Sequence, residues 1–303
     1  MEINMSKCYL CPRNCGTDRT AAIGFCGTGN KIKISRAALH QLEEPCISFK
    51  KGSGTIFFAG CNLHCVYCQN KKISDGSSGI EIPEDRFYDI LFELKNKGAE
   101  NINLVTAGHF ISHIIPLIKK AKQNGLDIPV VYNTSSYEKK CAIKKLEGIA
   151  DIYLPDLKYI SSSISEKYSS CSDYFKIASE AIDEMVNQKS ECIFTAEGKL
   201  ISGVIVRHLV LPENIDESKK IIKYLHGRYG NSIYMSIMSQ FTPVIQSDKY
   251  PELNRKLTTA EYNDVIDYAI DIGVENAFIQ EGESASESFI PEFNFEGVRP
   301  DIP

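Results

Sequence analysis

The 303-residue sequence lacks a basic excess, a long apolar run and an export signal, and each absence narrows the range of functions. Its net charge of −5 provides none of the basic surface typical of nucleic-acid binding, which disfavours a DNA or RNA partner. No apolar run approaches the roughly 20 residues that span a bilayer, and residues 1–7 lack the apolar core of a signal peptide. We therefore expect a cytoplasmic protein without membrane contact.

Cysteine, in contrast, is abundant, with eleven residues. Seven of them fall in two groups before residue 69, whereas Cys141, Cys171 and Cys192 are scattered. In a reducing compartment, clustered cysteines are more often metal ligands than disulfides. Both groups therefore predict metal sites, and the isolated Cys46 is interpreted as unligated.

The first group comprises Cys8, Cys11, Cys15 and Cys26, in a stretch rich in Gly, Pro, Arg and Thr. Because this stretch has little that could form a packed core, a bound metal is expected to organise it. Four thiolates satisfy either a structural zinc ion or a fully ligated [4Fe–4S] cluster, and the spacing leaves both open. Residues 1–51 are predicted to be this module followed by a linker over 31–51.

The second group, Cys61, Cys65 and Cys68, follows the apolar run 55–59, which is expected to be a buried strand. Three thiolates are one fewer than a zinc ion or a cubane cluster requires, so one position stays open for another ligand. A zinc loop completed by His64 is one alternative. Three cysteines on one helix face is another, although Gly60 and its surroundings disfavour a helix.

Beyond residue 54 the sequence alternates apolar runs with amphipathic segments, in about six repeats. This alternation predicts right-handed βαβ units and a parallel sheet. Strands are expected at 55–59, 101–106, 130–133, 151–157, 204–211, 232–238 and 276–279, helices at 83–97, 113–124, 137–146, 165–188, 215–228 and 259–273, and a small hairpin at 191–203.

Polar residues follow several of these strands, where α/β folds place their chemistry. We expect them to meet at one edge of the sheet. The candidates are Thr106, Gly108, His109, Asn133, Thr134, Asp156, Lys158, Arg207 and Gln240.

The C-x3-C-x2-C loop, with Tyr67 before its last cysteine, resembles the signature of the radical S-adenosylmethionine (SAM) enzymes. The resemblance implies a partial (β/α)6 barrel over 52–280, with 281–303 as a tail packed on it. It also implies a [4Fe–4S] cluster on Cys61, Cys65 and Cys68, with Tyr67 beside the adenine of SAM. Reductive cleavage of SAM would give a 5′-deoxyadenosyl radical, with the electron supplied by a ferredoxin or flavodoxin.

Residues 52–243 further resemble the branch that activates glycyl radical enzymes, the pyruvate formate-lyase activating enzyme-like group. The run from Cys8 to Gly16 marks the subgroup with an N-terminal four-cysteine module. In this branch the strand ends hold SAM, which implies that role for the polar candidates above. His109 stands where the branch has an acidic residue, and Asn133 likewise replaces a carboxylate.

Three functions are compatible with these features. The first is hydrogen abstraction from a glycine of a glycyl radical enzyme. The second is radical SAM modification of another peptide, an RNA or a small metabolite, with RNA disfavoured by the acidic charge. The third is a non-catalytic zinc-binding protein.

Overall fold

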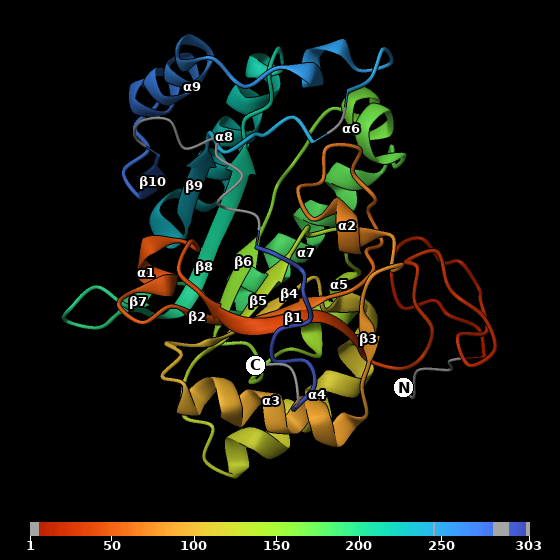
Figure 1. The fold of residues 1–303 in the computed structure, drawn as a ribbon. Helices are drawn as coiled ribbons and strands as arrows, with labels where there is room; N and C mark the ends of the chain where they lie inside the picture. The colour runs from red at the N-terminus through yellow and green to blue at the C-terminus, as the bar shows by residue number, and fades with distance from the viewer. Residues whose placement is uncertain (1–5, 245, 281–290, 301–303) are drawn as a thin grey trace.

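The computed structural model describes residues 6–244, 246–280 and 291–300, which form an α/β fold around one curved, open sheet (Figure 1). Its strand order is β10-β9-β8-β6-β5-β4-β2-β1-β3, and neighbours from β2 to β10 are parallel. These parallel strands are β2 (Ser53–Phe58), β4 (Ile102–Val105), β5 (Val130–Thr134), β6 (Ile152–Pro155), β8 (Leu200–Leu209), β9 (Tyr234–Met238) and β10 (Ala277–Ile279). In the part of the chain that is described, the sheet ends at β10 and β3, so the barrel is partial, as predicted.

Antiparallel strands extend this sheet. They are β1 (Lys33–His40), β3 (Ile80–Glu81) and β7 (Ile193–Phe194), the last pairing with β8 as the expected hairpin. The prediction of a linker over 31–51 is therefore wrong across β1, which pairs along β2. A register shift between Ile34 and Arg36 interrupts the alternation of buried and exposed side chains by which a strand is usually recognised.

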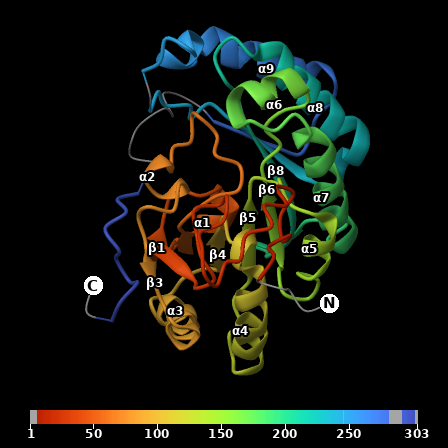
Figure 2. The same cartoon turned by 90° about the vertical axis from the view of Figure 1, so that its right-hand side faces the viewer.

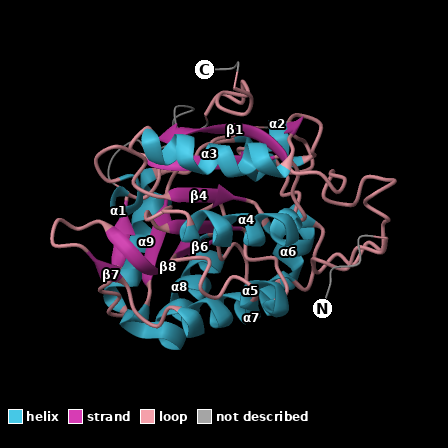
Figure 3. Cartoon of the chain, turned by 90° about the horizontal axis from the view of Figure 1, so that it is seen from below, coloured by secondary structure: helices cyan, strands magenta, loops and turns pink. Residues whose placement is uncertain are grey.

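The larger helices lie around the outside of the curved sheet (Figure 3). In α3, Phe87, Ile90, Leu91 and Leu94 are buried on one face, as the sequence predicts. The helices are α1 (Pro45–Ser48), α2 (Lys71–Ser74), α3 (Glu84–Asn96), α4 (Ile111–Gln123), α5 (Lys140–Lys144), α6 (Ser162–Ser169), α7 (Tyr174–Gln188), α8 (Ile215–Tyr229) and α9 (Thr259–Asp271), with 3₁₀ turns at Gly108–Phe110, Gly230–Ser232 and Pro251–Asn254.

Two helix predictions need correction. The single helix expected over 165–188 is divided into α6 and α7, because Ser170 takes a left-handed conformation (φ 48°) and ends α6. The surrounding serines compete for backbone hydrogen bonds and favour such an ending. The helix expected over 137–146 is reduced to α5, because the Glu138 carboxylate accepts from the buried Tyr132 and the Tyr137 hydroxyl donates to Asp173.

The residues before β1 form loops on one flank of the sheet, without a helix or strand from residue 6 onward (Figure 2). The predicted tail over 281–303 is described only at 291–300. There the Ala37 amide donates to the Glu296 carbonyl, and Arg86 donates to the Gly297 and Val298 carbonyls. Within the described ranges, no helix has the length and apolarity to cross a membrane.

Candidate functional site

A cavity of about 540 Å³ lies on the concave side of the sheet, within the size range of small-molecule sites. It combines the second cysteine group with polar residues from successive strand ends. The predicted residues that line it are Cys61, Cys65, Cys68, Tyr67, Thr106, Asn133, Thr134, Asp156, Lys158, Arg207 and Gln240.

The cysteine loop begins immediately after β2 and is held from outside by the N-terminal module. The Cys61 amide donates to the Cys26 carbonyl over 3.0 Å. Gly60 makes this approach possible, because at φ +86° a Cβ would lie 2.4 Å from that same carbonyl oxygen. Each cysteine group therefore positions the other.

The three thiols suit a bound iron cluster. Burial raises the pKa of Cys61, and burial raises that of Cys68 to about 12, so these two thiols stay protonated without a metal. Iron coordination would supply the positive charge that deprotonates them. His64 does not complete a zinc site here, because its Nε2 lies 3.1 Å from the Phe25 carbonyl and its ring packs on Phe25. A [4Fe–4S] cluster held by Cys61, Cys65 and Cys68 would therefore have one iron open to a ligand other than these cysteines and His64.

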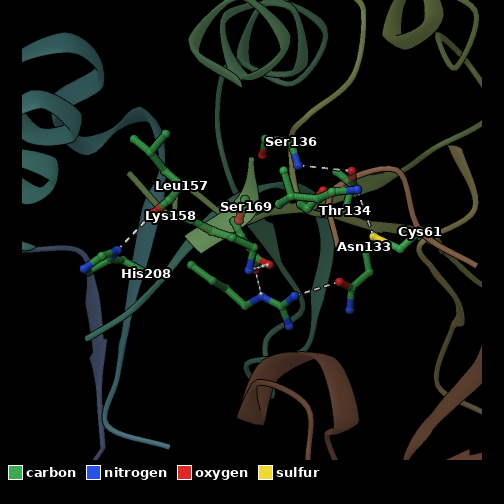
Figure 4. Close-up of polar contacts among 12 residues, drawn as sticks. Cys61, Asn133, Thr134, Ser136, Leu157, Lys158, Ser169 and His208 are labelled. Carbon is green, nitrogen blue, oxygen red and sulfur yellow. Dashed lines mark hydrogen bonds and ion pairs between the residues drawn. The ribbon is translucent and has the colours of Figure 1, made fainter. Parts of the chain in front are cut away.

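Four charged side chains of the cavity form one network centred on Arg207. Its Nε donates to Asp156 (2.9 Å), and its two Nη atoms donate to Glu43 (2.9 Å) and Asn133 (2.7 Å). The Lys158 ammonium donates to the other oxygen of Asp156 at 2.7 Å. Figure 4 shows Asn133 beside Cys61 and Lys158 on the other side of the network, whereas the ring of His208 points to the Leu157 carbonyl.

This network fixes the charges of its members. Burial alone would raise the pKa of Asp156, but Arg207 and Lys158 outweigh burial and lower it. Burial alone would lower the pKa of Lys158, yet the neighbouring Asp156 carboxylate raises it. All three groups are therefore ionised at neutral pH.

The sequence analysis missed the residues that the turn between β1 and α1 brings into the cavity, chiefly Glu43 and Glu44. The Glu43 carboxylate accepts from Arg207, and it also accepts from Asn103 (2.8 Å) and Asn133 (3.0 Å). The local sequence signal for these residues is a pair of glutamates before a proline that starts a helix, and it lies within the segment predicted to be a linker. Two acids thus reach the site from an element other than the strand ends.

Gly108 and His109 are not brought into the main cavity. His109 is buried, its Nε2 lies 2.8 Å from the Ala59 carbonyl, and its own carbonyl accepts from Arg19. A Cβ on Gly108 would collide with the Glu138 carboxylate. The structure therefore gives both residues packing contacts and a place in a small separate cavity beside Cys11, rather than in the main cavity with Cys61, Cys65 and Cys68.

Two other predicted residues line the cavity but have internal partners. The Tyr67 hydroxyl accepts from the Tyr159 hydroxyl at 2.7 Å, and the Tyr67 ring packs edge-on against Phe241. The Thr134 hydroxyl donates to the Glu138 carboxylate. Both side chains are thereby held in place without a ligand.

The N-terminal cysteines also lie near one another. The Sγ atoms of Cys15 and Cys26 are each 3.7 Å from the position of a Cβ on Gly24, and the Cys15 thiol lies 4.0 Å from the Cys8 carbonyl. Burial raises the pKa of Cys11 to about 11, with smaller contributions from Cys26 and Cys8. All eleven cysteines are free thiols. Among the described residues, no three Cys, His, Asp or Glu side chains already form a site for a single metal ion.

An open parallel barrel with three cysteines after its first parallel strand defines a metal-dependent α/β enzyme class. Residues 55–225, more than half of the chain, match the family profile of the radical SAM superfamily. The chain belongs to this superfamily. It is accordingly an enzyme that uses SAM with a [4Fe–4S] cluster.

The chain is also similar to known proteins in sequence and in fold. The chain is 29% identical over 270 residues to the uncharacterized protein MJ0674 of Methanocaldococcus jannaschii, covering 87% of this chain and 74% of that protein. Its fold is similar to that of Streptococcus suis SuiB bound to S-adenosylmethionine (TM-score 0.50, 14% identity, 74% of this chain and 49% of SuiB). It is also similar to HydG, a maturase of the [FeFe]-hydrogenase (TM-score 0.52, 15% identity, 73% and 50%). The chain thus matches about half the length of these two structures.

Proposed function

We propose that this enzyme binds SAM beside Cys61, Cys65 and Cys68 and removes a hydrogen atom from a substrate held in the same cavity. The observation that carries the proposal is that these cysteines share one cavity with Lys158 and the Arg207 network. When bound, a [4Fe–4S] cluster supplies the electron for reductive cleavage of SAM.

Lys158 is the residue we assign to the SAM carboxylate. An ammonium has three N–H donors, and among the described residues the Lys158 ammonium donates to one partner, Asp156. Arg207 already donates to three side chains, so we assign it the positioning of Asp156, Glu43 and Asn133. This changes the role that the family resemblance implies for Arg207.

A glycine of a glycyl radical enzyme is the substrate we propose first, on the support of the strand-end residues and their order in the chain. A small metabolite or another peptide is the second candidate. The polar floor made by Glu43 and Glu44 favours it, because such groups orient a ligand inside an enclosed site. RNA is least supported, given the net charge of −5.

We further propose that Cys8, Cys11, Cys15 and Cys26 hold a second [4Fe–4S] cluster or a zinc ion, and that a ferredoxin or flavodoxin supplies electrons. The hydrogen bond from the Cys61 amide to the Cys26 carbonyl supports a metal in the N-terminal module. A metal that folds this module would, through that bond, also hold the loop of Cys61, Cys65 and Cys68 in place. Iron and zinc analysis of the purified protein distinguishes the two metals.

The activity is tested by anaerobic reconstitution followed by SAM and a strong reductant. We expect a brown protein that releases 5′-deoxyadenosine, and we expect the triple variant Cys61→Ala, Cys65→Ala, Cys68→Ala to release none. Cys141→Ala, at an exposed isolated cysteine, is the matched control. Any iron left in the triple variant is assigned to the N-terminal group. Electron paramagnetic resonance with candidate glycyl radical enzymes then tests the first substrate, and absence of a glycyl signal rejects it.

A further inference from the structure

The floor of the cavity is built by the turn between β1 and α1. Because β1 runs antiparallel to β2, this turn lies near the start of β2, whereas the cysteine loop follows the end of that strand. Helix α1 closes the barrel beneath the turn, with Cys46 and Ile47 buried in an apolar cluster. The other buried members of the cluster are Val131, Ile152, Leu154, Leu200 and Ile205.

The charges around this floor do not balance. Arg207 and Lys158 are the Arg and Lys side chains that line the cavity among the described residues, and they donate to Asp156, Glu43 and Asn133. Glu44 makes no ion pair within the described ranges, although Arg207 and the Ser236 hydroxyl are near enough to favour its charged form. Glu44 is thus a carboxylate of the cavity with no cation bonded directly to it in the described residues.

We propose that Glu44 binds a positively charged group of the substrate, a protonated amine or a guanidinium. This inference rests on the proposed function, since it concerns the substrate of the same site. A partly buried carboxylate is costly without a counter-ion, and a cation that donates hydrogen bonds to it offsets this cost. Apolar side chains beside the floor, including Phe278 and Leu209, can contact the stem that carries such a cation.

SAM is itself cationic, but the residue assigned to it, Lys158, follows the end of β6 and lies near enough to Cys65 to interact with it electrostatically. Glu44 comes instead from the floor turn before α1 and lies near Ser236, which pairs with Arg207 across β8 and β9. The floor carboxylate is therefore available to a second ligand while SAM is bound.

The experiment uses the anaerobically reconstituted, unreduced enzyme with SAM bound. The probes are butylguanidinium and the uncharged butylurea, which have similar shapes, and their dissociation constants are measured by saturation-transfer NMR. We expect the wild-type enzyme to bind butylguanidinium roughly tenfold more tightly than butylurea, as suits one charge-assisted contact. Glu44→Gln should reduce this preference to less than about twofold and leave the affinity for SAM unchanged.

Three further variants make the test specific. Glu44→Asp keeps the charge and should retain most of the preference, whereas Glu44→Met should abolish it and replaces E44Q if that variant does not fold. Glu197→Gln, at an exposed glutamate on the turn between β7 and β8, should behave as wild type. The proposal is overturned if the wild type shows no preference, if E44Q keeps it, or if E44Q loses SAM instead. Because no reduction is involved, failure of SAM cleavage would be a separate result.

Discussion

The Arg207 guanidinium donates a 2.9 Å hydrogen bond to the Glu43 carboxylate, joining residues 164 positions apart in the chain. Glu43 precedes α1, and Arg207 lies on β8 in the middle of the parallel sheet. Through Asn133 and Asp156 the same guanidinium also reaches β5 and the end of β6. One arginine therefore ties the cavity floor to three neighbouring parallel strands.

Arg207→Ala should strongly destabilise the protein. Arg207, Glu43 and Asp156 are only 14%, 11% and 15% exposed, so removing the cation leaves two largely buried carboxylates without it. Breaking such a pair costs about 3–5 kcal/mol of unfolding free energy. Urea unfolding of the reconstituted enzyme under anaerobic conditions measures the loss. Arg228→Ala, which breaks a pair whose arginine is 56% exposed, is the control and should cost far less, because solvent screens an exposed ion pair. A similar small loss in Arg207→Ala would contradict the central role of Arg207.

The parallel strands and the cysteine loop were predictable because their signals are local. Strand β2 is fully buried and ends in the apolar residues Ile56 to Phe58, and the spacing of Cys61, Cys65 and Cys68 is contained in eight residues. The helix α3 likewise shows its buried face in the periodicity of its apolar residues.

The floor of the site was not predictable in the same way. Strand β1 has a register shift that hides its alternation, and Glu43 acquires its meaning only from Arg207, far along the chain. His109 shows the opposite error, since a polar residue after a strand can be required for packing instead of binding. The roles of Glu43 and His109 are both set by partners far away in the chain, and the local sequence does not reveal those partners.

Arg13→Ala should loosen the cysteine loop. The Arg13 guanidinium donates to the carbonyls of Asn62 (2.8 Å) and Leu63 (3.2 Å) in that loop, and to those of Ser169 (2.9 Å) and Ser170 (2.6 Å) at the end of α6. Loss of these bonds leaves carbonyls of both segments without their partner. We expect faster amide hydrogen exchange over residues 61–68 and a lower iron content after reconstitution.

The control for this variant is Arg36→Ala, whose guanidinium pairs with Glu296 away from the cysteine loop. It should leave iron content and exchange over 61–68 as in the wild type. If both variants lose iron equally, Arg13 has no specific role in holding the loop.

Glu44 should make the stability of the protein depend on pH. Burial raises its pKa from 4.5 to about 6; Glu43 and Asp156 act in the same direction, and Arg207 and the Ser236 hydroxyl oppose them. Since the folded state holds this proton more tightly, the stabilisation is complete below pH 4.5 and is lost as the pH rises through 6. Glu44→Gln lacks this titration, so its stability relative to wild type should rise by about 2 kcal/mol between acidic and mildly alkaline pH.

Urea unfolding of both proteins at pH 5 and pH 8 measures most of this difference. Glu197→Gln provides the comparison for an exposed glutamate and should show no comparable change. An equal gap between Glu44→Gln and wild type at the two pH values would show that Glu44 is not buried as the structure has it.

His109→Gln should leave SAM binding intact and change the response to acid. A carbonyl only accepts hydrogen bonds, so Nε2 carries the hydrogen that it donates to Ala59, and a glutamine amide can replace that donor. Burial lowers the pKa of His109 from 6.5 to about 3. The stabilisation from the neutral ring is therefore present above pH 6.5 and is lost as the pH falls toward 3, so the difference in stability between wild type and variant should shrink in acid.

Equilibrium dialysis should give the His109→Gln variant an affinity for SAM within roughly twofold of wild type. Lys158→Gln should weaken SAM binding by about tenfold or more, as loss of a charge-assisted bond predicts. Equal losses in the two variants would place His109 in the SAM site after all, since only a residue that contacts the ligand would match Lys158.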